Sequence, residues 1–404
     1  MKRRSFLCAL AALILLSWTV LSGCSRSRES VYLLNGYPEL EESLLTMAKR
    51  YEKEEGVRVR VVTVTRGGYE NTLNTELNHF GPPAIFTVTA RTAQTWREFL
   101  LDLSDTAFAK ARTTTVFDIT DGEQLLAVGW GDRCLGLAVN SSLLEKSGHS
   151  LEEITDYDSL RRVCQDIHAR TDVLGFDAFA SADLTDSAWR VTDVLFAPVY
   201  ARETAEDPED PSGQYMEHFR TIWELYLSNG LTDRDKLAEG GADPREEFLR
   251  GKAVFLPADS TEYAALSAAA PEVAMIPVYC ELEGEGGLVC HTGDAWAVNA
   301  SLTPSEQKNA LAFLQWMVTD PEASAALAEH LGVLPFAGAE SPNAFLRTAG
   351  EDVAAGRSGV SNLVSDRADP DRYRKNLTEA LQLYGTDPTE ESWAEVKKVL
   401  TDNK

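Results

Sequence analysis

The sequence lacks the short motifs that mark most enzymes. It contains no G-x-S-x-G, H-E-x-x-H or C-x-x-C pattern, and its six histidines are scattered. The glycines at 284, 286 and 287 are not followed by the helix that a dinucleotide-binding loop requires. Carboxylate pairs are too frequent in so acidic a chain to indicate a catalytic pair. The residues therefore offer no recognisable motif for catalysis, for a cofactor or for a metal.

Positive charge is also scarce. The 404 residues include 38 Lys and Arg against 63 Asp and Glu, a formal net charge of −25. Such a surface repels nucleic acid and anionic lipid headgroups. We therefore expect no nucleic-acid partner.

Long apolar runs are absent apart from one near the start. Three cations at positions 2–4 precede an apolar run over residues 6–21, and Leu21-Ser22-Gly23-Cys24 follows. This arrangement is typical of a lipoprotein signal peptide with its lipobox. It predicts removal of residues 1–23, lipidation of Cys24, a tether over 24–30, and a body anchored at the extracytoplasmic face of the membrane. An uncleaved membrane helix or an ordinary secretory signal is the alternative.

Cysteines are few beyond Cys24. Cys134, Cys164, Cys280 and Cys290 are too few for a disulfide scaffold. Cys280 and Cys290 flank a glycine-rich turn and could face each other across a hairpin, and a Cys134–Cys164 pair is also open. Free buried thiols are the alternative.

Apolar periodicity indicates that strands and helices alternate along the chain. The N-terminal β-α-β-α order predicts a largely parallel sheet covered by helices. Capping signals predict helices that begin at Asp156, Asp243 and Thr303. The expected elements are helices with apolar positions 40–51, 69–80, 160–167, 215–226, 244–250 and 304–317, and strands at 57–61, 85–88, 253–256 and 273–278.

Two segments have the pattern of chain that crosses between lobes. Leu125–Asn140 and Gly287–Asn299 each read as a strand, are interrupted by Gly and Asp, and resume as an apolar strand that ends in Asn. Ligands bind in the cleft between two lobes. The sequence therefore predicts a cleft beside these two segments.

Six stretches together resemble the extracellular solute-binding proteins, family 1, of carbohydrate ABC importers. The resemblance covers essentially the whole chain after Cys24, and the order of the stretches carries it. They are residues 44–64 with 69–73, residues 125–148, the helix start at 157–160, Phe248–Phe255, Asp294–Asn299 with the helix ending at 313–317, and Leu331–Pro335.

The resemblance implies an α/β, two-lobed periplasmic-binding-protein-like (type II) fold with a hinged cleft. It implies an N-terminal lobe of residues 31–132 plus 294–335 and a C-terminal lobe of residues 133–293 plus 336–404. It also implies no catalysis, so the protein is not expected to be an enzyme, and no obligatory cofactor. We expect a monomer that captures a small carbohydrate and delivers it to the ABC permease subunits, and we expect no metal site.

A cleft for a sugar needs aromatic platforms and polar groups that bind hydroxyls. Residues near the crossings and strand ends are candidates, and family positions add a Trp-Arg pair and one tyrosine. Burial in the core is the alternative for the tryptophans. The predicted ligand-binding residues are Tyr37, Tyr69, Arg91, Trp130, Asp132, Trp189, Arg190, Tyr263, Asp294 and Trp296.

The sequence departs from the family where close relatives carry further aromatics, at 259–263 and 360–366. A non-sugar solute therefore stays open. A surface lipoprotein that senses ligand for a membrane kinase, or that is a scaffold for partners, is a separate alternative with the same fold. A lipid-anchored glycoside hydrolase is the remaining alternative.

Overall fold

The computed structural model describes residues 30–204, 213–280, 286–338, 340–361 and 369–401. The predicted signal peptide, Cys24 and most of the tether lie outside these residues, as does most of the polar loop at 204–213. Among the described residues, no helix is both long and apolar enough to span a membrane.

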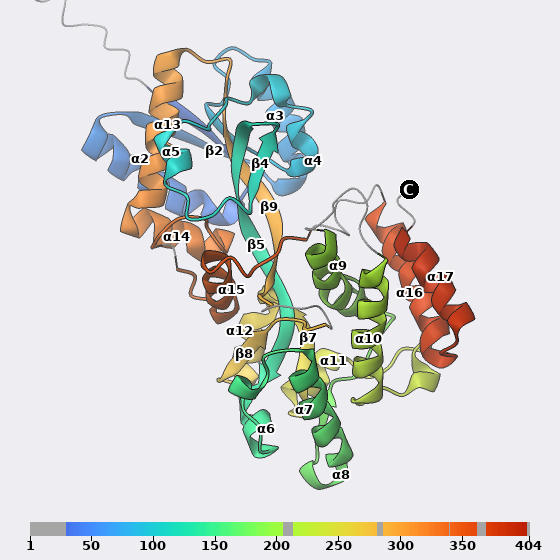
Figure 1. The fold of residues 1–404 in the computed structure, drawn as a ribbon. Coiled ribbons are helices and arrows are strands. Elements are labelled where there is room, and N and C mark those ends of the chain that lie inside the picture. Colours follow the sequence, from blue (N-terminus) through green and yellow to red (C-terminus); the bar gives the residue numbers. More distant parts are fainter. Residues whose placement is uncertain (1–29, 205–212, 281–285, 339, 362–368, 402–404) are drawn as a thin grey trace, which may run out of the picture.

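The protein is a two-lobed α/β structure joined by two long strands (Figure 1). Figure 1 shows α2, α3, α5, α13 and α14 around the upper lobe and α6 to α12 with α16 and α17 around the lower one. The strands are β1 Ser30–Asn35, β2 Arg58–Thr63, β3 Ile85–Val88, β4 Asp118–Asp121, β5 Gln124–Asn140, β6 Asp177–Phe179, β7 Ala253–Asp259, β8 Val273–Ile276 and β9 Val289–Val298.

The helices mostly follow the expected apolar stripes and caps. Asp156 and Thr303 form capping boxes for α7 and α13, and Asp243 caps α11 with Pro244 at its first position. The helices are α2 Glu41–Glu55, α3 Tyr69–Leu77, α4 Ala90–Ala93, α5 Ala107–Lys110, α6 Ser141–Lys146, α7 Tyr157–Ala169, α8 Thr171–Leu174, α9 Phe196–Thr204, α10 Gln214–Ser228, α11 Pro244–Leu249, α12 Tyr263–Ala269, α13 Pro304–Thr319, α14 Pro321–Leu331, α15 Ala344–Ala354, α16 Pro370–Thr386 and α17 Glu390–Thr401.

The sheet is mixed. The N-terminal strands from which a parallel sheet was predicted do pair in parallel, but the prediction was wrong for the sheet as a whole. Its order is β2-β1-β3-β9-β5-β7-β6, with β4 and β8 also paired to β5. β1 pairs in parallel with β2 and β3, and β6 with β7, but every pair that involves β5 or β9 is antiparallel. The two crossing strands run in opposite directions between the lobes, which the local β-α-β-α rhythm could not reveal.

β5 runs without a break through the region where interruptions were expected. The glycines and the aspartate lie instead where the pairing of β5 with β9 is irregular. The register shifts between Gly129 and Gly131 and again between Gly131 and Arg133. Such bulges bend a strand and re-aim its side chains. Asp132 lies at the second shift, where it projects into the site described below.

Each lobe has its own apolar core. Val31, Tyr51, Phe313 and Leu331 belong to the core of the upper lobe, whereas the lower core gathers residues of α7, α10, α16 and α17. The division into 31–132 with 294–335 and 133–293 with 336–404 places its boundaries within β5 and β9 and after α14. It stays a prediction.

Candidate functional site

A cavity of about 320 Å³ opens where β5 and β9 leave the upper lobe. It is bounded by the turn after β1, the turn before α3, the start of α4 and the middle of both crossing strands. Its lining residues are Gly36, Tyr37, Arg66, Tyr69, Glu70, Thr89, Ala90, Arg91, Asp132, His291, Thr292, Gly293 and Asp294.

Tyr37 is fixed in place by the end of β1. The Asn35 side chain accepts a hydrogen bond from Tyr37 N at 3.0 Å and donates to Tyr37 O at 2.7 Å. The Tyr37 hydroxyl then donates to Asp294 Oδ2 at 2.7 Å, and the Arg66 guanidinium lies 4.3 Å from the ring centroid. Tyr37 thereby connects the upper lobe to the crossing strand β9.

Asp294 is largely withdrawn from water. Burial raises the pKa of its carboxyl above the ordinary value, and the nearby Asp132 raises it further, while the hydrogen bond from Tyr37 and the charge of Arg66 oppose the shift. Burial beside Asp294 also raises the pKa of Tyr37, so this hydroxyl stays protonated. Asp294 is an acceptor with one oxygen already engaged.

Asp132 supplies a second carboxylate from β5. Its Oδ1 lies 2.9 Å from His291 Nδ1 on β9, and its side chain is 31 % exposed. A Cβ atom at Gly293 would lie 3.1 Å from Asp132 Cβ, so the absence of a side chain at Gly293 admits the carboxylate. The two crossing strands together present two acidic groups to one cavity.

Tyr69 forms part of the wall by close packing against a glycine. A Cβ atom at Gly36 would lie 2.7 Å from Tyr69 Cδ2, and the Tyr69 hydroxyl accepts a hydrogen bond from Thr87 N at 2.7 Å. Burial raises the pKa of Tyr69. Its oxygen is thus held by the backbone of β3, while its ring packs against Gly36 in the wall of the cavity.

The structure brings five of the predicted site residues together at this cavity: Tyr37, Tyr69, Arg91, Asp132 and Asp294. Sequence reasoning missed Arg66, Glu70 and His291. His291 stands in the same crossing segment as Asp294, three residues earlier, which is the signal that could have found it.

The two tryptophans of the crossings are not among the lining residues. Trp130 is fully buried and Trp296 is 6 % exposed, and their ring centroids lie 4.5 Å apart in the core of the upper lobe. Tyr37 covers this pair, with its ring centroid 5.8 Å from that of Trp130. The indoles therefore pack behind Tyr37, which lines the cavity, and a ligand cannot stack on them in this structure.

The three candidates of the lower lobe lie elsewhere. Arg190 is buried and donates to both oxygens of Glu262 at 2.7 Å and to Pro257 O at 2.7 Å, with Trp189 stacked on it. Trp189 lines a separate hollow of about 510 Å³ beside α16. Tyr263 begins α12 and packs edge-on against Phe345.

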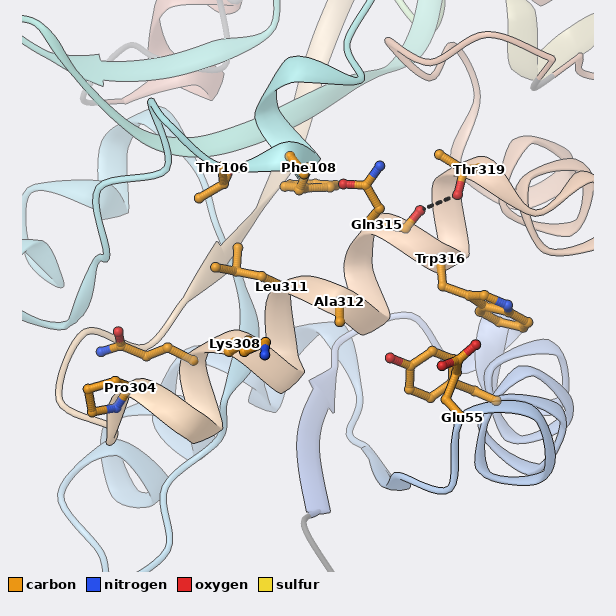
Figure 2. Close-up of a pocket in the computed structure, with 13 residues that line it drawn as sticks. Glu55, Thr106, Phe108, Pro304, Lys308, Leu311, Ala312, Gln315, Trp316 and Thr319 are labelled. Atoms are coloured by element: carbon orange, nitrogen blue, oxygen red, sulfur yellow. Dashed lines mark hydrogen bonds between the residues drawn. The ribbon is translucent and has the colours of Figure 1, made fainter.

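The upper lobe carries a larger hollow of about 660 Å³ between α13, α5 and the end of α2 (Figure 2). Its walls are mainly apolar, with Phe108, Leu311 and Trp316 facing it, and its lining residues come from neither β5 nor β9. It has no set of converging polar groups like that at Tyr37 and Asp294, so the smaller cavity is the better candidate site.

The site has the chemistry of recognition. Its carboxylates accept hydrogen bonds, and Arg66, Arg91 and His291 offer donors to a polar guest. Within the described ranges, no group of three or more histidine, cysteine, aspartate or glutamate side chains is placed to bind a metal ion.

A cavity with converging polar groups beside the strands that join two lobes defines a binding protein. The chain belongs to the family of bacterial extracellular solute-binding proteins, whose model matches residues 46–348. The resemblance noted in the sequence is thereby confirmed, and with it an extracytoplasmic location. The members of this family bind solutes.

Solved structures share the fold across nearly the whole chain. Apo RafE from Streptococcus pneumoniae has a TM-score of 0.66 at 15% identity, covering 93% of this chain and 98% of its own. A family 1 extracellular solute-binding protein from Bifidobacterium longum subsp. infantis has a TM-score of 0.67 at 16% identity, and the match covers 92% of this chain and 98% of that protein. The solute receptor AcbH has a TM-score of 0.68 at 14% identity, and the match covers 93% of this chain and 98% of AcbH. Among curated proteins, none matches the sequence significantly.

Proposed function

We propose that this chain is the lipid-anchored solute receptor of an ABC importer and that it captures a small carbohydrate for delivery to a permease. The observation that carries the proposal is the placement of Asp132 and Asp294 on the two crossing strands, in one cavity with Arg91. Carboxylates and a guanidinium are the groups that bind vicinal hydroxyls in pairs.

The chemistry of similar proteins supports a sugar. RafE has been solved in complex with raffinose, and AcbH prefers β-D-galactopyranose. The cavity of about 320 Å³ is at the small end of the range for ligand sites, which favours a monosaccharide or a short oligosaccharide. Because Trp130 and Trp296 are buried, we expect the polar groups and not aromatic stacking to supply most of the affinity.

A thermal-shift screen of the full chain in detergent tests the carbohydrate. A ligand that binds only the folded state stabilises it by about 2.7 kcal/mol at one hundred times its Kd. We expect one or a few sugars in a panel of mono- and oligosaccharides to raise the melting temperature. Amino acids and short peptides serve as the comparison panel. A response to those compounds and to no sugar would contradict the carbohydrate assignment.

Substitution of Cys24 tests the anchor separately. We expect Cys24→Ser to abolish lipid attachment, so that fractionation no longer recovers a lipidated chain that is extractable only with detergent. Cys164→Ser, a buried thiol in the lower lobe, is the control and is expected to leave fractionation unchanged. Equal recovery of a lipidated form from both variants would rule out Cys24 as the attachment site.

A further inference from the structure

Two cysteines lie directly opposite each other where the lobes join. Cys134 of β5 and Cys290 of β9 are register partners in the antiparallel pair, and both are fully buried in one apolar cluster. This pairing joins neither Cys280 to Cys290 nor Cys134 to Cys164, the two pairs that the sequence left open. Cys134, Cys164 and Cys290 are free thiols in the described chain.

The backbone hydrogen bonds identify the type of strand pair. Cys290 N donates to Gly359 O at 2.9 Å, and Cys290 O accepts from Ser361 N at 3.0 Å, both on the side away from β5. Cys134 N donates to Ser260 Oγ at 3.1 Å. The two residues therefore form a non-hydrogen-bonded pair, for which opposite Cα atoms lie about 4.5 Å apart. That spacing is within the range of about 4.4–6.8 Å that disulfides use.

The surroundings leave space for sulfur on the shared face. A Cβ atom at Gly131 would lie 3.2 Å from Cys290 Cβ and 3.3 Å from its Sγ, so the absence of a side chain at Gly131 accommodates Cys290. In the thiol form, Cys134 Sγ lies 3.8 Å from Met275 Sδ, and Cys290 Sγ lies 3.7 Å from Ser358 Oγ. These contacts are weak, and a covalent bond can replace them.

We propose that Cys134 and Cys290 form a disulfide that links the two crossing strands. One thiolate attacks a small-molecule disulfide or a disulfide oxidoreductase and forms a mixed disulfide. The second thiolate attacks the protein's sulfur in the mixed disulfide, which makes the Cys134–Cys290 bond, breaks the mixed disulfide and expels the oxidant's remaining thiolate. Two protons and two electrons leave the chain, and the oxidant departs as two thiols. Extracellular proteins are located in an oxidising compartment, where disulfides form and persist.

Burial determines when the bond can form. It raises the pKa of Cys290 to about 12 and that of Cys134 well above its usual value, so thiolate is scarce in the folded protein. The exchange therefore takes place as the chain folds, before β5 and β9 close over the sulfurs. Once formed, the bond fixes the register of the strands that carry Asp132 and Asp294.

Peptide mapping of the full chain tests the bond directly. The protein is exported, isolated without reductant, denatured, alkylated and cleaved after Lys, Arg and Glu. Cys134 then lies in the fragment 134–145, and cleavage after Glu281, Glu283 and Glu285 separates Cys280 from Cys290. We expect the two fragments to be joined, with the mass of their sum less two hydrogens. Alkylation of both Cys134 and Cys290 would overturn the proposal.

A stability measurement extends this test. We expect reductant to lower the thermal midpoint of the wild type by roughly 5–10 °C and that of Cys290→Ala not at all. Cys164→Ala, another fully buried thiol, is the matched control and keeps the full response to reductant. A wild-type midpoint that is insensitive to reductant would count against the bond. Since the mapping uses the wild type, a variant that fails to fold does not affect the conclusion.

Discussion

Each lobe contains an arginine that lies over an aromatic ring and pairs with a glutamate, but the arginine is exposed in the upper lobe and buried in the lower one. In the upper lobe, Arg66 lies 4.3 Å from the Tyr37 ring and pairs with Glu39, and both charged side chains are well exposed. In the lower lobe, Arg190 lies 4.5 Å from the Trp189 ring and pairs with Glu262, but Arg190 is 4 % exposed. The first set borders a cavity, and the second is sealed within the structure.

The difference shows that residue type alone does not identify a binding group. Arg190 directs its bonds to Glu262 and to a backbone carbonyl, so it has little left for a guest. Arg66 and Arg91 stand in water at the edge of the cavity. We therefore propose recognition as the role of the upper set and a structural role for the lower one, and four experiments test this contrast.

Glu262→Gln is expected to have the largest effect. It leaves the buried Arg190 charge without its counterion, which destabilises the fold by about 3–5 kcal/mol. The matched change Glu39→Gln removes the exposed partner of Arg66 and is expected to cost about 0–1 kcal/mol. Denaturant unfolding of both variants measures the two values, and equal losses would erase the distinction between the two sets.

Asp294→Asn is expected to weaken ligand binding by roughly 10- to 100-fold, because a charged acceptor is replaced by a neutral one in a desolvated site. Titration calorimetry with the sugar found in the screen measures this change. Asp371→Asn, at a fully exposed position on α16, is the control and should bind normally. Normal affinity in Asp294→Asn would remove this carboxylate from the site.

Gly36→Ala is expected to destabilise the upper lobe by about 1–3 kcal/mol, because the added Cβ collides with the Tyr69 ring, whose hydroxyl is fixed to β3. Gly67→Ala is the control, since nothing lies within 4 Å of its added Cβ. Thermal unfolding compares the two. If both changes were equally mild, the Tyr69 wall would be more adaptable than the close packing indicates.

The smallest effect concerns pH. The pKa of Asp294 is raised in the folded state, so its ionised form opposes folding at neutral pH. This penalty is present above the folded-state pKa and is lost as the pH falls through that pKa toward the unfolded value of about 3.9. We therefore expect Asp294→Asn to be slightly more stable than the wild type near pH 7 and to lose this advantage near pH 4. A pH series of melting temperatures checks the sign.

Local sequence signals predicted much of the fold but not the depth of the site. The strand Ile85–Val88 and the caps at Asp156 and Thr303 depend on neighbouring residues, and they are as expected. Phe80 was expected in the helix that begins at Tyr69, but it lies beyond α3 and is fully exposed. The spacing of apolar residues along a helix does not show at which turn the helix stops packing against the rest of the protein, and therefore does not show where it ends.

Trp130 and Trp296 show the same limit at the site. Their segments correctly indicated strands beside a cleft, and each indole lies two residues from a carboxylate that lines the cavity. What covers them comes from elsewhere in the chain: Tyr37 follows β1 and is near Trp130, and Phe108 of α5 packs edge-on against Trp296. Depth below a surface depends on such long-range partners, which spacing along one segment does not contain.

The cavity wall also has a kinetic consequence. All the residues around it come from the upper lobe and the two connecting strands. If the solute binds here as proposed, it meets a complete surface before either lobe moves. For the neutral sugar proposed above, we expect the association rate to be limited by diffusion and by the orientation that this surface requires. We expect changes at Trp189, which lines a separate hollow, to leave that rate unaltered.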